Sequence, residues 1–426
     1  MTTPAASPAP APPRKTPWRA LALLILWAVF MFAAVLNPQA VLFSTDDNLG
    51  ATTWRATMLP EGLAGAWDPS ALLGQPTSFS ASLTNLLLWI LPTSVFINWI
   101  HAFYLAGASF FLLLYLRHWR LAWSACALAT LTAFWLGNNF TLTYAGHIPK
   151  FAILMWVCAY LWLIERASAR RSAAQAILAG FVLGLQFGEQ PDVALFCALV
   201  LGAYTLFVLW RDHRRAPALW LRLLAPLLLV ALLMAVHPLY SGYRTAVQDM
   251  ASLNPADPDA QWDFCTQWSW PPEESIDFVA PGYMGWRSGE PAGPYWGRMG
   301  RSAGWEQTRR GFLNFKLENQ YLGAIPVLFA LTGLLLAWRR HPPGATATAP
   351  ADPWQLTLRC WTLITLVTLL LAFGKHFPLY RLFYQLPMIS SIRNPNKFLH
   401  LFQIGVAILA AAGLDRAQRA DEEPRP

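Results

Sequence analysis

The stretch from Leu219 to Tyr240 reads LWLRLLAPLLLVALLMAVHPLY, and Arg222 is its one charged residue. A hydrocarbon core about 30 Å thick is crossed by about 20 apolar residues in a helix, because only a helix satisfies its own backbone hydrogen bonds in lipid. This stretch therefore predicts a transmembrane helix.

The rest of the chain has the same character. Of its 426 residues, 55% are apolar and 13% are charged, against about 25% charged in an average soluble domain. The sequence predicts an all-α polytopic membrane protein with about ten transmembrane helices. We place them at about 18–36, 95–116, 121–140, 151–164, 173–187, 193–210, 219–240, 321–338, 354–373 and 398–413.

Positive charge is unevenly distributed between the two sides of these spans. One side holds 18 of the 31 basic residues and seven of the 23 acidic residues, a net charge of +11, and the other side carries −3. The positive-inside rule predicts that both termini are cytoplasmic. Topology thus accounts for the basic pI, and nucleic acid is not expected as a partner. No carboxylate falls inside any of the ten predicted spans.

The first span and a glycine repeat add detail to this topology. A first span longer than the usual 7–15 residues of a signal-peptide core favours an uncleaved anchor. Gly180, Gly184 and Gly188 recur every four residues, a pattern that allows close helix packing.

The predicted topology divides the chain into five parts. They are a disordered Pro/Ala-rich cytoplasmic tail (1–17), a bundle of about seven spans (18–240) with a first outer loop (37–94), a Trp-rich outer segment (241–320), a bundle of about three spans (321–413) and a cytoplasmic tail (414–426).

Adjacent carboxylates, Asp46 and Asp47, open the first outer loop. Two such groups repel each other, so the pKa of one could be raised into the range of a general base, or the pair could bind a divalent cation. Alternatively, Thr45, Asp46 or Asp47 caps a short surface helix that ends at Pro60. Catalysis and capping both remain open at this pair.

Two further outer loops carry ionisable residues close to the bilayer. His147 could act as a base or donate to phosphate, and Lys150 could pair with a lipid-borne phosphate; both could instead anchor a helix end. Glu189 and Asp192 flank a very short loop, where desolvation raises a carboxylate pKa, unless they only end and cap helices.

Arg393 and Lys397 flank a proline turn at the outer interface, where the positive-inside rule disfavours them. They therefore need a compensating partner. An anionic head group or pyrophosphate would provide one, and so would Asp46 or Glu189.

The outer segment 241–320 is rich in tryptophan and arginine. Aromatic faces suit sugars and guanidinium groups suit phosphate, but packing in a small cap accounts for most of these tryptophans. The Asp257-Pro258-Asp259 sequence matches a short metal-binding pattern, which we interpret as chance. No P-loop, Gly-x-Gly-x-x-Gly, His-Glu-x-x-His or Gly-x-Ser-x-Gly motif occurs.

Several short motifs follow one another in a recognisable order: Trp67-Asp68-Pro69 leading to Gly74-Gln75-Pro76, Gly146-His147, Trp268-Ser269-Trp270-Pro271-Pro272-Glu273, Pro281-Gly282-Tyr283, Tyr295-Trp296-Gly297, Tyr321-Leu322-Gly323-Ala324 and Arg393-Asn394-Pro395-Asn396-Lys397. From about Asn37 to Gly413 this order resembles the YfhO-like family of bacterial membrane proteins. That family is similar to the GT-C glycosyltransferases, multi-span enzymes that take a sugar from a polyprenyl-phosphate donor on the non-cytoplasmic face.

The resemblance implies a GT-C-like fold in the bacterial inner membrane. It also implies that a first-loop acid, here Asp46 or Asp47, is the base or organises a metal, and that His147, Glu189 and Arg393 surround the donor phosphate. The resulting hypothesis is transfer of a sugar from a polyprenyl-phosphate-linked donor to a glycan, lipid or protein acceptor of the cell envelope. The alternatives are a transporter or flippase of lipid-linked saccharides and a non-catalytic membrane assembly protein.

Overall fold

The computed structural model describes residues 18–37, 39–69, 74–77, 79–243, 257–289, 293–338, 352–386 and 389–422. The predicted tail at 1–17 lies outside these ranges, as do residues 244–256 and 290–292 of the predicted outer segment. The described chain is predominantly helical, which confirms the all-α membrane class. It also contains one small antiparallel hairpin, in which β1 (Ala66–Asp68) pairs with β2 (Gln75–Thr77).

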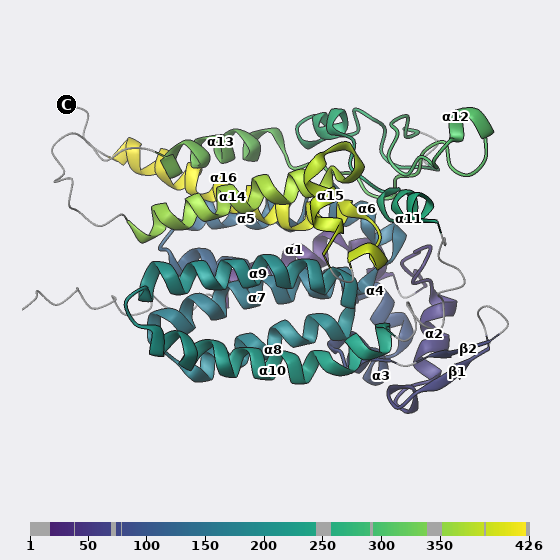
Figure 1. Cartoon of the computed structure of the whole chain (residues 1–426), viewed down its shortest axis with the longest axis horizontal. Helices are drawn as coiled ribbons and strands as arrows, with labels where there is room; N and C mark the ends of the chain where they lie inside the picture. Colours follow the sequence, from purple (N-terminus) through teal and green to yellow (C-terminus); the bar gives the residue numbers. More distant parts are fainter. Residues whose placement is uncertain are drawn as a thin grey trace, which may run out of the picture.

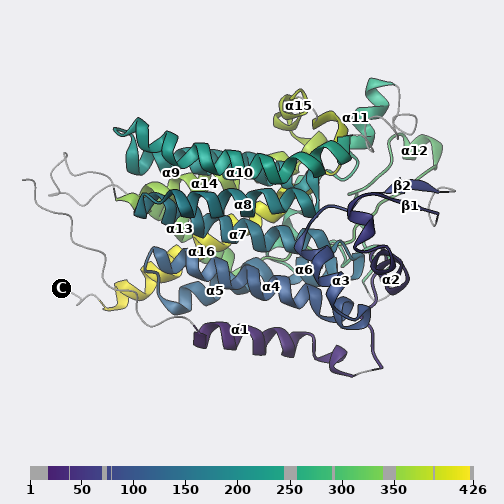
Figure 2. The same ribbon diagram turned by 90° about the horizontal axis from the view of Figure 1, so that it is seen from below.

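Ten long or apolar helices form a bundle whose axes run roughly side by side (Figure 1). The peripheral helix α1 lies along one edge of the bundle (Figure 2). These helices are α1 (Trp18–Met31), α4 (Thr93–His118), α5 (Trp123–Phe134), α7 (Ile148–Arg170), α8 (Ala173–Glu189), α9 (Pro191–His213), α10 (Pro217–Tyr243), α13 (Ala324–Trp338), α14 (Pro353–Ala372) and α16 (Leu399–Glu422).

The predicted count of about ten transmembrane helices is wrong. Six helical stretches in the described part of the chain are long and apolar enough to cross a membrane. They are Thr93–His118, Ile148–Arg170, Pro191–His213, Pro217–Ser241, Pro353–Ala372 and Pro395–Ala420. Helices α1, α8 and α13 are apolar but shorter. The structure therefore supports a multi-pass membrane protein with fewer full-length spans than the hydropathy pattern suggested.

The predicted span 121–140 is one reason why the structure has fewer long apolar helices than predicted. This span is broken into α5 and α6 (Gly137–Ala145). The side-chain amide of Asn139 donates to the carbonyl oxygens of Ala133 and Phe134, both at 3.2 Å. Carbonyl groups at a helix C-terminus lack partners within the helix. Asn139 thus satisfies the end of α5 and allows the chain to change direction in a buried position.

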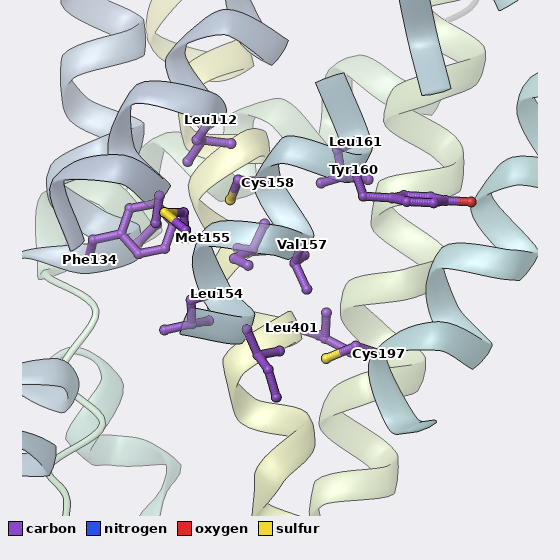
Figure 3. Close-up of a cluster of buried hydrophobic side chains, with 14 of the residues drawn as sticks. Leu112, Phe134, Leu154, Met155, Val157, Cys158, Tyr160, Leu161, Cys197 and Leu401 are labelled. Atoms are coloured by element: carbon purple, nitrogen blue, oxygen red, sulfur yellow. The ribbon is translucent and has the colours of Figure 1, made fainter. Parts of the chain in front are cut away.

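Helix α7 lies at the centre of the bundle and packs against α4, α8 and α9. Val157 and Cys158 of α7 lie among buried side chains from four other helices, including Leu112 of α4 and Leu401 of α16 (Figure 3). Cys158 is fully buried and unpaired, so it behaves as a small apolar side chain.

Glycines set the closest helix crossings, as the four-residue repeat predicted. A Cβ atom on Gly180 would lie 2.2 Å from the carbonyl oxygen of Leu227, and one on Gly184 would lie 2.4 Å from the Cβ of Met234. Both neighbours belong to α10. The helix-packing interpretation is therefore confirmed for Gly180 and Gly184, whereas a Cβ atom on Gly188 would lie 2.7 Å from the carbonyl oxygen of Ala81, outside any helix.

The statement that no carboxylate lies inside a span is wrong for Glu165. Helix α7 continues to Arg170, beyond the predicted end at residue 164, and Glu165 is 1% exposed within it. Arg211 of α9 binds this carboxylate with both terminal nitrogens, at 2.7 and 3.2 Å. Tyr204 also donates to Glu165. A bidentate ion pair with an added donor compensates this buried charge.

The remaining elements gather at one end of the bundle (Figure 1). A buried ion pair holds part of this end together, because the Lys316 ammonium lies 2.6 Å from Asp277 and 4.0 Å from Glu274. The elements are η1 (Ala33–Leu36), α2 (Leu49–Thr57), η2 (Glu61–Leu63), α3 (Leu83–Ile90), α11 (Pro258–Thr266), η5 (Pro272–Phe278), α12 (Trp305–Thr308), η6 (Gly374–His376), α15 (Pro378–Tyr384), η7 (Ile389–Ser391) and η8 (Pro395–Phe398).

The crossing of α8 and α10 gives a testable prediction. Gly180→Ala places a methyl group against the backbone of Leu227, so we expect a loss of about 1–3 kcal/mol of stability, as for other overpacked sites. Gly202→Ala in α9 is the matched control, because nothing lies within 4 Å of its added Cβ. Thermal unfolding in detergent measures both. Equal unfolding temperatures for the two variants would contradict the close packing.

Candidate functional site

The first outer loop is attached to the chain that leads into α7. The backbone N–H of Thr45 donates to the carbonyl of Tyr144 at 2.8 Å, and that of Asp46 donates to Ala145 at 3.0 Å. These bonds join segments about 100 residues apart in sequence. They place both aspartates at the N-terminal end of α7.

A glycine permits this close approach. Gly146 has φ of 96°, and a Cβ atom there would lie 2.7 Å from the backbone nitrogen of Asp47. His147 follows with φ of 50°, a left-handed conformation that is uncommon for a residue with a side chain. The turn is thus built so that the imidazole of His147 and the two aspartates share one small region.

Asp47 is occupied by structural contacts. One of its carboxylate oxygens accepts the N–H of Ile148, the first residue of α7, at 2.9 Å. The other lies 3.3 Å from the Arg55 guanidinium. Asp47 therefore caps α7, and the expected capping of the following surface helix is wrong, because Asn48 caps α2 by accepting the N–H of Ala51 at 3.0 Å.

Asp46 differs from its neighbour. Its side chain is 61% exposed, and its Oδ2 atom lies 3.4 Å from Nε2 of His147. Burial, together with the positive charge of Lys150, lowers the pKa of His147 to about 3. The imidazole is therefore neutral at ordinary pH, beside a carboxylate that faces solvent.

Deeper in the same region lie two lysines and one acid. Lys397 donates to Asp192, and Asp192 also accepts the N–H of Val193 at 2.8 Å. Lys150 is only 8% exposed, yet within the described ranges no hydrogen bond or ion pair reaches its ammonium group. Lys150 lies within electrostatic range of His147 and Asp192. A buried ammonium with incomplete compensation attracts an anion.

His400 belongs to this cluster and was missed in the sequence. It lies three residues after Lys397, one turn further along the same helical stretch, and it is 5% exposed with its Nδ1 atom unpartnered among the described residues. Lys150 and His147 are its electrostatic neighbours. Its spacing from Lys397 was the only signal in the sequence, because residues three apart share a helix face.

Glu189 and Arg393 make their direct contacts outside this cluster, although Arg393 lies within electrostatic range of Lys397. Glu189 accepts the N–H of Thr84 at 3.3 Å and packs beside α3. The Arg393 guanidinium stacks over Phe264 at 4.1 Å and over Trp268 at 5.0 Å. The expectation that Asp46 or Glu189 compensates Lys397 is wrong, since Asp192 does so.

The outer aromatic residues divide into two groups. Trp270 is fully buried and stacks on Phe278 with ring centroids 5.6 Å apart, as the packing interpretation predicted. Tyr283 and Trp296 instead remain more than half exposed, and their ring centroids lie 5.8 Å apart.

The short acidic pattern Asp257-Pro258-Asp259 has a structural role. Asp257 caps α11 by accepting the N–H of Ala260 at 2.9 Å.

The residues present do not fit the divalent cation considered for Asp46 and Asp47. Both oxygens of Asp47 already accept hydrogen bonds. Across the described ranges, no group of three or more His, Cys, Asp or Glu side chains could hold a metal ion.

Comparison of the chain with protein-family models, curated proteins and solved structures finds no match. The resemblance to the YfhO-like family therefore remains a prediction based on the order of its motifs.

The two aspartates are expected to respond differently to substitution. Asp47→Asn removes the charge that caps α7 and pairs with Arg55, so we expect a loss of about 1–3 kcal/mol of stability. Asp46→Asn is the matched control and changes stability by less than about 0.5 kcal/mol, as expected at an exposed site. Thermal unfolding followed by tryptophan fluorescence compares them. Equal destabilisation by both variants would contradict this assignment.

The charge state of His147 can be measured directly. In the NMR spectrum of histidine-labelled protein in detergent, the His147 signal is identified as the one that the His147→Gln variant lacks. In the wild type this signal should not shift between pH 8 and pH 5. Because the unfolded imidazole takes up a proton near pH 6.5 and the folded one only near pH 3, the wild type should lose stability relative to His147→Gln as the pH falls from about 6.5 toward 3. A titration midpoint above pH 5 would refute the neutral assignment.

Proposed function

We propose that this protein is a membrane glycosyltransferase that moves a sugar from a polyprenyl-phosphate-linked donor to a cell-envelope acceptor. The observation that carries the proposal is the position of His147, which lies 3.4 Å from the exposed carboxylate of Asp46 and within electrostatic range of the buried cations of Lys150 and Lys397. A base and an anion site side by side suit transfer from a phosphate leaving group.

The proposed reaction is an inverting displacement. Asp46 takes the proton of the acceptor hydroxyl, and the acceptor oxygen forms a bond to the anomeric carbon of the sugar. The bond between that carbon and the phosphate oxygen breaks, and its electron pair leaves with the lipid phosphate. Lys150 and Lys397 stabilise the charge on this phosphate, and neutral His147 lies 3.4 Å from the Asp46 carboxylate.

The roles differ from those that the resemblance implied. Asp47 is assigned to the structure of the loop because both of its oxygens are engaged. Arg393 and Glu189 are left out of the phosphate site because their contacts lie elsewhere. The proposed setting is the bacterial inner membrane with cytoplasmic termini, which rests on the distribution of basic residues.

The exposed aromatic residues support a carbohydrate acceptor. Tyr283 and Trp296 present ring faces to solvent in the outer segment. Arg287, from the same segment, stacks on the ring of Tyr144 at 3.6 Å. Since the backbone of Tyr144 holds the loop of Asp46, a sugar bound on these rings would lie near the proposed base.

The decisive experiment measures transfer of labelled sugar from a polyprenyl-phosphate donor in proteoliposomes. We expect Asp46→Asn to lower the rate by about 10²–10⁴-fold, the usual contribution of a general base. Lys150→Met should mainly weaken donor binding. Asp259→Asn, at an exposed position on α11, is the matched carboxylate control and should retain full activity.

Two results would reject the proposal. Full transfer by Asp46→Asn would exclude the mechanism. Movement of donor lipid across the bilayer by the wild type, with no sugar transferred, would favour the transporter instead.

A further inference from the structure

A cavity of about 820 Å³ lies at the other end of the bundle. It is lined by the last residues of α4 and α16 and by the first residues of α14. Arg416, in its wall, follows Lys397 by 19 residues along nearly continuous helix, so it lies roughly 30 Å from the proposed phosphate site at 1.5 Å per residue. The cavity is thus separate from the site described above.

The charged wall of this cavity is predominantly basic. Arg120, Arg416 and Arg419 line it, together with Asp352 and Asp415. Both acids are engaged within the protein. Asp415 accepts the N–H of Ala122 at 2.7 Å and pairs with Arg419 at 2.8 Å, and Asp352 caps α14 by accepting the N–H of Trp354 at 3.1 Å.

Arg120 contributes charge without compensation. It follows α4 by two residues in a left-handed conformation with φ of 61°, and no ion pair involves its side chain in the part of the chain that the structure describes. Arg419 donates to its backbone carbonyl at 3.4 Å, which keeps the two residues close.

Aromatic and aliphatic side chains complete the lining. Trp119 and Trp354 stack with ring centroids 5.1 Å apart, and Leu336 and Leu358 lie beside them. The indole N–H of Trp119 is buried and finds no acceptor among the described residues. Tryptophan is typical of the level of lipid head groups, where one end of a ligand is apolar and the other is polar.

We propose that this cavity binds the phosphate group of an anionic phospholipid. The phosphate would lie between Arg120 and Arg416. A lipid fits better than a soluble phosphate because exposed leucines continue the apolar surface along the neighbouring helices, including Leu335 of α13 and Leu363 of α14, which are 69% and 61% exposed. This inference does not depend on the proposed glycosyl transfer.

Native mass spectrometry of the full chain in detergent tests the proposal with phosphatidylglycerol and phosphatidylcholine of the same acyl length. We expect phosphatidylglycerol to bind at least about tenfold more tightly. Arg120→Gln combined with Arg416→Gln should remove most of that preference, because each arginine near an anionic head group contributes appreciably to binding.

Arg171→Gln is the matched control. Arg171 is another left-handed arginine that ends a helix, with φ of 51°, but it does not line the cavity. It should leave the preference unchanged. Equal loss in Arg171→Gln would show a general surface-charge effect and overturn the site, as would equal binding of the two lipids by the wild type.

Two further arms identify the source of the phosphate and guard against misfolded variants. Displacement of phosphatidylglycerol by millimolar glycerol phosphate would overturn the lipid assignment in favour of a soluble ligand. In the wild type, brominated phosphatidylglycerol should quench tryptophan fluorescence more than brominated phosphatidylcholine does, and Trp119→Phe should reduce that difference. No difference between the two brominated lipids would also count against the site.

Discussion

An ionisable side chain inside a lipid-embedded bundle has to be compensated by the protein, because hydrocarbon offers no solvation. Glu165 meets this requirement through Arg211, and Asp192 does so through Lys397. Each pair joins helices that are distant in sequence and so also fixes how they pack. Lys150 is also buried but has no bonded partner among the described residues. Its neighbour His400 likewise has an Nδ1 atom without a partner in the described part of the chain. Polar groups left unsatisfied side by side mark a place where a ligand is expected.

The sequence was sufficient for the class of fold and less so for its details. Long apolar runs such as Leu219–Tyr240 predicted helices that the structure contains. Hydropathy averaged over a whole span did not predict the break between α5 and α6, since the short polar stretch Gly137-Asn138-Asn139 lies within a long apolar run and Asn139 ends α5 through its side chain. Hydropathy also ended the fourth predicted span before Glu165, because a carboxylate lowers the mean hydropathy of the residues around it. The sequence alone does not show that Arg211, 46 residues away, pairs with this carboxylate.

The same limit applied to the candidate site. Asp46 and Asp47 are equivalent in sequence, and only contacts with distant residues distinguish them. Asp47 caps a helix that begins 101 residues later. Lys397 and Asp192 are both candidate site residues, but they are separated by 205 residues and nothing in the sequence identifies them as partners. His400 was missed because one histidine in an apolar helix carries no pattern of its own, and its significance comes from the lysine that α7 brings near it.

The position of His147 determines how the carboxylate beside it can act. Near Lys150 and partly buried, His147 has a pKa of about 3, so it is a poor proton acceptor at neutral pH. The proton of an acceptor hydroxyl would therefore go to Asp46. The imidazole nitrogen lies 3.4 Å from that carboxylate. Burial is the larger cause of the low pKa of His147, and the positive charge of Lys150 adds to it. Lys150 thus contributes both to a site that attracts an anion and to the neutral state of the histidine beside the proposed base.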